Sequence, residues 1–273
     1  PHLLFPSPFF FFFLFLFFFF IVLVFSWVLC TAGKAHYELV QYKQACLLYE
    51  RAISCEPHRL DGLETYSSIL WQLKRQVQLC YLAQRLSAQH RVNSITCCVL
   101  GNCFSADKEH ETAIKFFERA TQIDPYCTYA YTLCGHEYVQ NEDLEKALTA
   151  FRNAIRIDER HYNAWYGLGN ILYRQEKYKL AAIHFQRAIQ INPGNAVLHC
   201  HLGMVLHDDR KQEDALSALE MAIKVDPNNV LAHYKQASVL ASLRQNEVSN
   251  REVGTLFLFP CSSTSLLINF FLS

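Results

Sequence analysis

Apolar residues between positions 94 and 229 recur at the three- and four-residue spacing of amphipathic helices, and the whole pattern repeats. A shift of 34 residues brings it into register four times. One copy places large and small side chains in the order Trp165, Leu168, Gly169, Leu172, Ala181, Phe185, Ala188, Pro193. Each copy is long enough for two helices, and the proline stops the second one. The pattern therefore predicts a series of helical hairpins.

A 34-residue period with this order of residues is typical of the tetratricopeptide repeat. Small side chains let two helices approach closely, and we expect Gly169 to face Ala181 within its hairpin. One hairpin cannot bury its apolar face alone, so the copies must stack. We predict an all-α solenoid, a right-handed superhelix of hairpins. The turns inside the four complete hairpins are expected at Asp107–Lys108, Asn141–Glu142, Gln175–Glu176 and Asp209–Arg210.

The repeat register divides the chain into five segments. Residues 94–229 hold four complete repeats, and the flanking segments match the pattern only in part. The predicted segments are an apolar Phe-rich stretch (1–32), partial and degenerate repeats (33–93), the complete repeats (94–229), the first helix of a truncated repeat (230–247) and a disordered tail (248–273).

The two ends differ in composition from the repeats. More than half of the 21 phenylalanines lie in the first 25 positions, and residues 9–29 form an uncharged run long enough to span a membrane. However, residues 3–20 use only Phe, Leu, Pro and Ser, whose codons can all be written in pyrimidines. We therefore predict translated intron sequence at residues 1–32, with a transmembrane helix as the alternative. Val248-Ser249 is a possible translation of a splice donor, so the same origin is predicted for the tail.

Charge and cysteine usage narrow the function classes. The formal net charge is zero, so nothing favours nucleic acid or an anionic membrane as a partner. The eleven cysteines include no Cys-x-x-Cys pair, and we expect reduced, partly buried thiols, with Cys97 and Cys134 packed inward. No phosphate-binding loop, metalloprotease or nucleophile-elbow motif is present. The sequence therefore predicts no enzyme activity, no cofactor and no metal.

A binding surface is expected where the first helices of successive hairpins line a concave groove. Amides, a guanidinium and tyrosines at these positions can hold an extended peptide. The candidate groove residues are Asn102, His136, Asn163, Tyr166, Asn170, Tyr173, Arg174 and His207.

Four strings are more specific than the repeat signature: Gly101–Ser105, Ala113–Phe117, Tyr129–Leu133 and Arg160–Gly169. They resemble the cell-division-cycle-27 family, subunit 3 of the anaphase-promoting complex, which is a ubiquitin ligase. The resemblance implies a non-catalytic scaffold of the cell cycle, in the nucleus and cytoplasm. It implies other ligase subunits as partners, and activator tails ending in Ile-Arg as ligands of the C-terminal repeats. Family members form homodimers through N-terminal repeats, which we expect to be missing from this chain.

Two alternatives remain. Asn102 and Asn170 each follow the repeat glycine, as in the repeats of protein O-linked N-acetylglucosamine transferase, although no glycosyltransferase domain is recognised in this chain. A membrane-anchored repeat adaptor is the other reading, and it depends on residues 9–29 being a genuine span.

Overall fold

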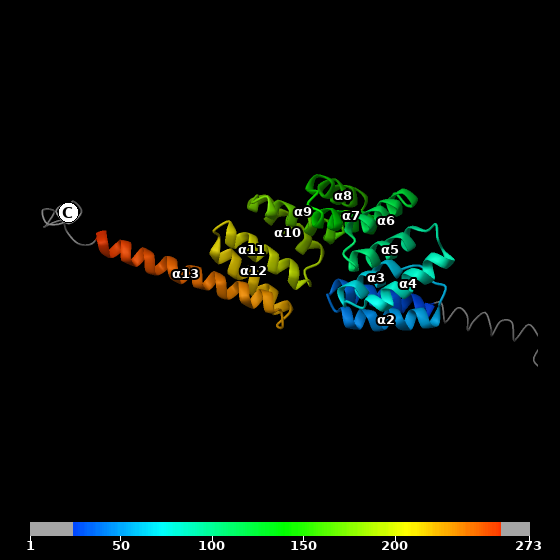
Figure 1. Ribbon diagram of the computed structural model, residues 1–273. Helices are drawn as coiled ribbons and strands as arrows, with labels where there is room; N and C mark the ends of the chain where they lie inside the picture. Colours follow the sequence, from blue (N-terminus) through cyan, green and yellow to red (C-terminus); the bar gives the residue numbers. More distant parts are fainter. Residues whose placement is uncertain (1–23, 258–273) are drawn as a thin grey trace, which may run out of the picture. The chain divides into compact units, whose positions relative to one another are not determined.

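The computed structural model describes residues 24–257, with side chains described through residue 244. It divides into two compact units, one ending at Leu198 and the other beginning at His199. Within residues 24–257 the regular structure is α-helical, without strands (Figure 1). The all-α repeat fold predicted from the sequence is confirmed. Most of the predicted apolar stretch and the end of the predicted tail lie outside the described residues.

The helices follow one another with short connections. Before the first labelled helix, residues 24–38 are helical. The first unit then contains α2 (Tyr42–Cys55), α3 (Leu63–Gln72), α4 (Gln76–Gln89), α5 (Ser94–Ala106), α6 (His110–Ile123), α7 (Thr128–Gln140), α8 (Leu144–Ile157), α9 (Tyr162–Arg174) and α10 (Tyr178–Ile191). The unit boundary falls within α11 (Ala196–Asp208), and α12 (Gln212–Val225) and α13 (Val230–Phe257) follow.

The turn inside each hairpin has one residue in the left-handed region of the backbone. These residues lie 34 positions apart and have φ between 56° and 63°: Val40, Lys74, Lys108, Glu142, Glu176 and Arg210. The backbone N–H of the residue after each one donates a hydrogen bond to a carbonyl in the last turn of the preceding helix. Glu109 N–H, for example, donates to the Phe104 carbonyl at 2.9 Å. This hydrogen bond satisfies a carbonyl that the helix end leaves without a partner. The four turns predicted from the sequence are confirmed.

The helix through residues 24–38 is the first helix of one more hairpin. Val40 has the same left-handed φ as the other turn residues, and Gln41 N–H donates to the His36 carbonyl at 2.9 Å. Gly33 lies against the ring of Tyr49 in α2, and Leu29 and Cys30 are buried. The boundary predicted between residues 32 and 33 thus falls inside a helix. The prediction rested on the change in composition, but residues on both sides of the boundary pack against the same neighbours.

The core follows the repeat register. Phe117, Phe151, Phe185 and Leu219 occupy one repeat position and are fully buried. Each lies over the glycine of its own first helix, so that a Cβ on Gly135 would be 2.6 Å from the Phe151 ring. The atoms nearest to a Cβ on Gly169 belong to the ring of Phe185, at 3.0 Å. At the equivalent Gly203, the nearest atoms include the Ala215 carbonyl oxygen, at 3.2 Å, and Ala215 stands 34 residues after Ala181.

The degenerate repeat at 60–93 keeps the hairpin by exchanging large and small residues. Ser67 replaces the glycine and Ala83 replaces the aromatic residue, whereas Leu79 and Leu86 replace two alanines. All four side chains are buried. Cores tolerate such exchanges when the total volume is kept. The altered copy therefore has the same hairpin fold as its neighbours.

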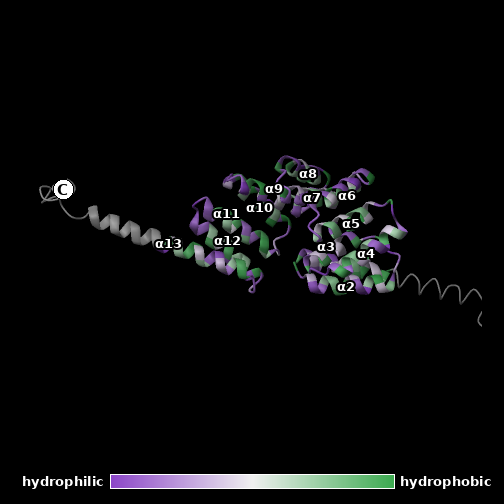
Figure 2. Ribbon diagram, in the orientation of Figure 1, coloured by the Kyte–Doolittle hydropathy of each residue, from purple (hydrophilic) through white to green (hydrophobic). Residues whose placement is uncertain are grey.

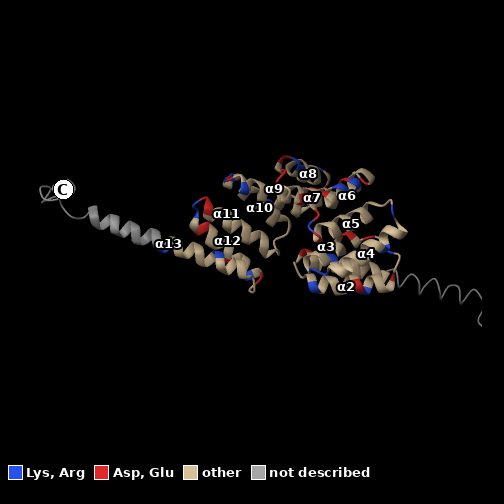
Figure 3. Ribbon diagram, in the orientation of Figure 1, with Lys and Arg blue, Asp and Glu red and all other residues tan. Residues whose placement is uncertain are grey.

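The last described helix of the second unit is α13, which packs against α12. Helix α13 continues past residue 247, where the sequence predicts the last repeat helix to end, and reaches Phe257. Leu231 and Leu240 of this helix are both 44% exposed. In Figure 2 apolar residues run along the described helices of both units, and in Figure 3 acidic and basic residues are interspersed. None of the described helices is both long enough and apolar enough to cross a membrane.

Candidate functional site

A groove with a volume of about 1060 Å³ lies in the first unit. We call it the peptide groove. First helices of successive hairpins form its wall, through Ser68 and Trp71 of α3, Asn102 and Ser105 of α5, Tyr129, Thr132, His136, Glu137 and Gln140 of α7, and Tyr162, Asn163 and Tyr166 of α9. Lys74, Lys108 and His110 contribute from the hairpin turns and α6, and Asn195, Val197 and Leu198 from the start of the next repeat.

Hydrogen bonds between neighbouring first helices order the polar side of the groove. The Asn102 amide donates to Ser67 Oγ at 2.7 Å and to Ser68 Oγ at 3.3 Å. The Ser105 hydroxyl donates to Glu137 Oε1 at 2.7 Å, and His110 Nδ1 lies 2.7 Å from Glu137 Oε2. Both oxygens of the buried Glu137 carboxylate are thus bonded. A wall tied together in this way is preorganised, which lowers the entropic cost of binding.

Trp71 is a groove residue that the sequence analysis missed. Its indole N–H donates to Ser105 Oγ at 3.2 Å, and its side chain remains 42% exposed at the groove. The residue lies in the degenerate repeat, whereas the candidate groove residues were all taken from the four complete repeats. The repeat period could have identified it, because Trp71 stands 34 residues before Ser105 and therefore at an equivalent repeat position.

The turn of the N-terminal hairpin closes one side of the groove. The rings of Tyr37 and Tyr42 lie 5.7 Å apart, and both residues line the groove. The Glu38 carbonyl accepts a hydrogen bond of 2.9 Å from the amide of Asn192, a residue far along the chain. Burial is the main cause that raises the pKa of the Tyr37 hydroxyl. The N-terminal hairpin thus supplies part of the groove lining, including residues outside the four complete repeats.

The predicted groove residues fall into two sets. Four of them line the peptide groove: Asn102, His136, Asn163 and Tyr166. The other four lie elsewhere. Asn170, Tyr173 and Arg174 are further along α9, where Arg174 donates to the Val139 carbonyl at 3.4 Å and the Tyr173 ring lies 5.9 Å from that of Tyr178. His207 belongs to the second unit and pairs with Gln212 at 2.6 Å.

Two partly buried histidines, one of them lining the groove, make stability depend on pH. His136 packs edge-on against Phe151, and burial, with His161 nearby, lowers its pKa to about 4. Burial also lowers the pKa of His161 to about 4. The unfolded value is about 6.5, so between these values the unfolded state binds protons that the folded state excludes. We expect stability to fall as the pH falls from 6.5 towards 4, by up to about 1.4 kcal/mol per pH unit for each histidine.

Urea unfolding at pH 7, 6 and 5 measures this dependence. In His136→Gln the free energy of unfolding should change less steeply with pH, because this variant lacks one of the two histidines that bind a proton only in the unfolded state. Equal slopes for His136→Gln and the parent protein would contradict the expectation.

Comparison with known proteins agrees with the geometry. Residues 95–127 and 135–196 match the tetratricopeptide repeat family. The chain is 44% identical over 117 residues to protein bimA of Emericella nidulans, covering 43% of this chain and 14% of that protein. It is 49% identical over 103 residues to anaphase-promoting complex subunit 3 of Dictyostelium discoideum, covering 38% of this chain and 11% of that protein. It is 50% identical over 99 residues to the human cell division cycle protein 27 homolog, covering 36% of this chain and 12% of that protein.

The hairpins, their period and these matches define the described fold as a tetratricopeptide repeat array. Over the matched residues the chain is similar to cell division cycle protein 27 homologs and to subunit 3 of the anaphase-promoting complex. The match spans less than a sixth of the length of these relatives.

Proposed function

We propose that this chain is a non-catalytic part of the anaphase-promoting complex, where its repeats hold segments of partner proteins. The names of its relatives support the complex, and the peptide groove supports the holding role. The partners are other ligase subunits and activator tails ending in Ile-Arg. The proposed place of action is the nucleus, with the cytoplasm as a second compartment.

One observation carries this proposal: first helices from four successive hairpins form a single groove with amides, aromatic rings and cations at its wall. Asn163 and Gln140 offer donors and acceptors for the backbone of an extended peptide. Trp71 offers an aromatic surface for an apolar side chain. Lys74 and Lys108 are exposed at the hairpin turns, where they can pair with a terminal carboxylate.

Binding of a labelled peptide ending in Ile-Arg to the full chain tests the proposal, with fluorescence anisotropy as the readout. We expect Trp71→Ala to weaken binding by at least about tenfold, which corresponds to about 1.4 kcal/mol. An amidated peptide should lose a similar factor because it lacks the terminal carboxylate. Tyr126→Ala is the matched control, since Tyr126 is an aromatic residue 81% exposed and outside the groove.

Asn170→Ala and Arg174→Ala locate the binding site along α9. If only these two variants weaken binding, the ligand lies further along the array than the peptide groove. If the parent chain does not bind the peptide at all, the tail-holding role is wrong for this segment. Transfer of ubiquitin by the purified chain without other ligase subunits would contradict the non-catalytic role.

A further inference from the structure

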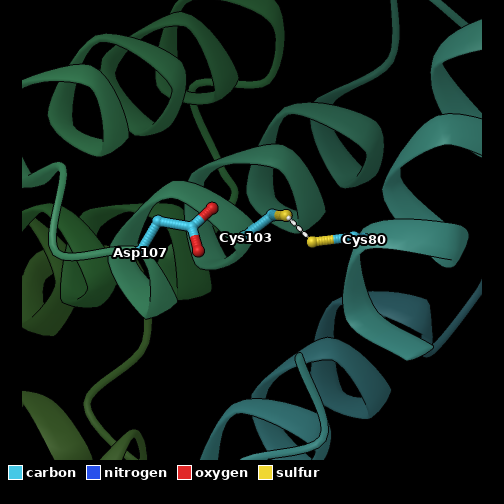
Figure 4. Close-up of side chains that lie close together, drawn as sticks. All are labelled: Cys80, Cys103 and Asp107. Atoms are coloured by element: carbon cyan, nitrogen blue, oxygen red, sulfur yellow. Dashed lines mark hydrogen bonds between the residues drawn. The ribbon is translucent and has the colours of Figure 1, made fainter. Parts of the chain in front are cut away.

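Two thiols from neighbouring hairpins face each other at the junction of α4 and α5. Cys80 of α4 and Cys103 of α5 place their Sγ atoms 3.0 Å apart (Figure 4). A disulfide bond is about 2.0 Å long, and both cysteines are free thiols. The contact lies outside the peptide groove, whose lining includes neither residue. It is therefore a separate cluster of reactive groups.

A carboxylate completes the cluster. Asp107 follows Cys103 by four positions and so lies on the same side of the chain at the end of α5. One ligand atom from each of Cys80, Cys103 and Asp107 lies within 4.8 Å of the others. The side-chain amide of Gln76 in α4 donates a hydrogen bond to Asp107 Oδ1, which holds the carboxylate toward α4. Two helices thus bring three potential ligands to one point.

We propose that Cys80, Cys103 and Asp107 bind a thiophilic divalent cation, with Zn²⁺ as the chemical type. Two sulfur ligands and one oxygen ligand suit Zn²⁺, which is usually four-coordinate and can take water as its fourth ligand. Zinc–sulfur bonds are about 2.3 Å long. A tetrahedral site then requires the two sulfurs to be about 3.8 Å apart, so they must separate by less than about 1 Å.

Binding is a simple exchange of protons for the cation. The thiols of Cys80 and Cys103 each release a proton to solvent, two metal–sulfur bonds form, and no electron is transferred. Uptake of the cation must displace these protons, so binding strengthens as the pH rises.

The location gives the cation a structural consequence. Cys80 belongs to the hairpin of α3 and α4, whereas Cys103 and Asp107 belong to the next hairpin, and α4 packs against α5. A bound cation links these two repeats directly. Because it binds the folded state, it raises stability in proportion to the logarithm of its concentration over its dissociation constant.

A second thiol pair offers an internal comparison. Cys98 and Cys127 also lie in one cluster, and their proximity raises the pKa of the Cys98 thiol and lowers that of Cys127. Among the described residues, only the cluster of Cys80, Cys103 and Asp107 brings three potential ligand atoms together. The Cys98–Cys127 pair therefore should not retain a divalent cation, and its variants serve as controls. The sequence predicts no metal, since the two sulfur ligands stand 23 residues apart and match no ligand motif.

Titration of the reduced full chain with Co²⁺ as the probe tests the proposal. We expect one equivalent to bind with a thiolate-to-cobalt charge-transfer band, to be displaced by Zn²⁺, and to raise the melting temperature. Cys80→Ser and Cys103→Ser should abolish the band. Asp107→Asn changes an exposed residue and so preserves the fold, and it should weaken binding by at least about tenfold. Cys127→Ser and Cys55→Ser should bind as the parent chain does.

Several results would overturn the proposal. The parent chain could show no thiolate band, or Cys80→Ser could bind Co²⁺ as strongly as the parent. Loss of the band in Cys127→Ser but not in Cys103→Ser would place the site at the other thiol pair. A Cys80–Cys103 disulfide found by mass spectrometry in the freshly reduced chain, without uptake of Co²⁺, would make the pair a redox pair instead of a metal site.

Discussion

Replacing Gly167 with alanine is expected to destabilise the array by about 1–3 kcal/mol, although alanine is the better helix former. Gly167 belongs to α9, but the group it approaches is Phe151 of the preceding hairpin. A Cβ at this position would be 2.3 Å from the Phe151 ring, and that ring is fully buried. Since a buried ring cannot move aside without displacing its own neighbours, the overlap outweighs the gain in helix propensity of about 1 kcal/mol.

Gly169→Ala is the matched control for this prediction. Gly169 lies in the same helix, and its replacement gives the same gain in helix propensity, but its Cβ would stand 3.0 Å from the nearest ring atom of Phe185. A shift of a few tenths of an ångström relieves that contact, so we expect a change of less than about 1 kcal/mol. Urea unfolding of both variants measures the difference. Equal stability of Gly167→Ala and Gly169→Ala would show that the two hairpins separate more easily than the structure implies.

Phe151→Ala is expected to have the largest effect on stability, a loss of about 3–5 kcal/mol. The ring is fully buried, lies over Gly135 of its own hairpin and Gly167 of the next, and packs against His136. Its removal leaves a cavity at the junction of two repeats, which rigid helices cannot fill. Phe116→Ala is the control in the neighbouring repeat, because that ring is only partly buried and stacks on Phe104.

The two substitutions should be strongly non-additive. The three atoms nearest to a Cβ on Gly167 all belong to the Phe151 ring, so without that ring the methyl group fills part of the cavity. Gly167→Ala should therefore be neutral or stabilising in the Phe151→Ala background, in contrast to its effect in the parent chain. A double-mutant cycle by urea unfolding measures this coupling. Simple additivity would mean that Gly167 and Phe151 are not in contact.

The sequence by itself determined the repeat, and with it most of the helices and turns. A 34-residue period constrains the contacts within a hairpin and those between neighbouring hairpins, since both recur in every copy. For this reason the inward cysteines Cys97 and Cys134 and the four hairpin turns are confirmed, and Phe117, Phe151 and Phe185 are buried at one repeat position. The homology to the cell division cycle protein 27 group was also present in the sequence, in strings more specific than the period.

Other features were decided only by the tertiary structure. The helix through residues 24–38 packs as a repeat helix despite its composition, because burial of one face is sufficient and Gly33 can lie against Tyr49. Which candidate residues share a groove depends on how the stacked hairpins bend, and a contact such as that between Glu38 and Asn192 has no counterpart in the period. The contact between the Cys80 and Cys103 sulfurs likewise does not recur in the other repeats. A repeat pattern specifies equivalent positions, whereas contacts made by only one copy arise from packing in three dimensions.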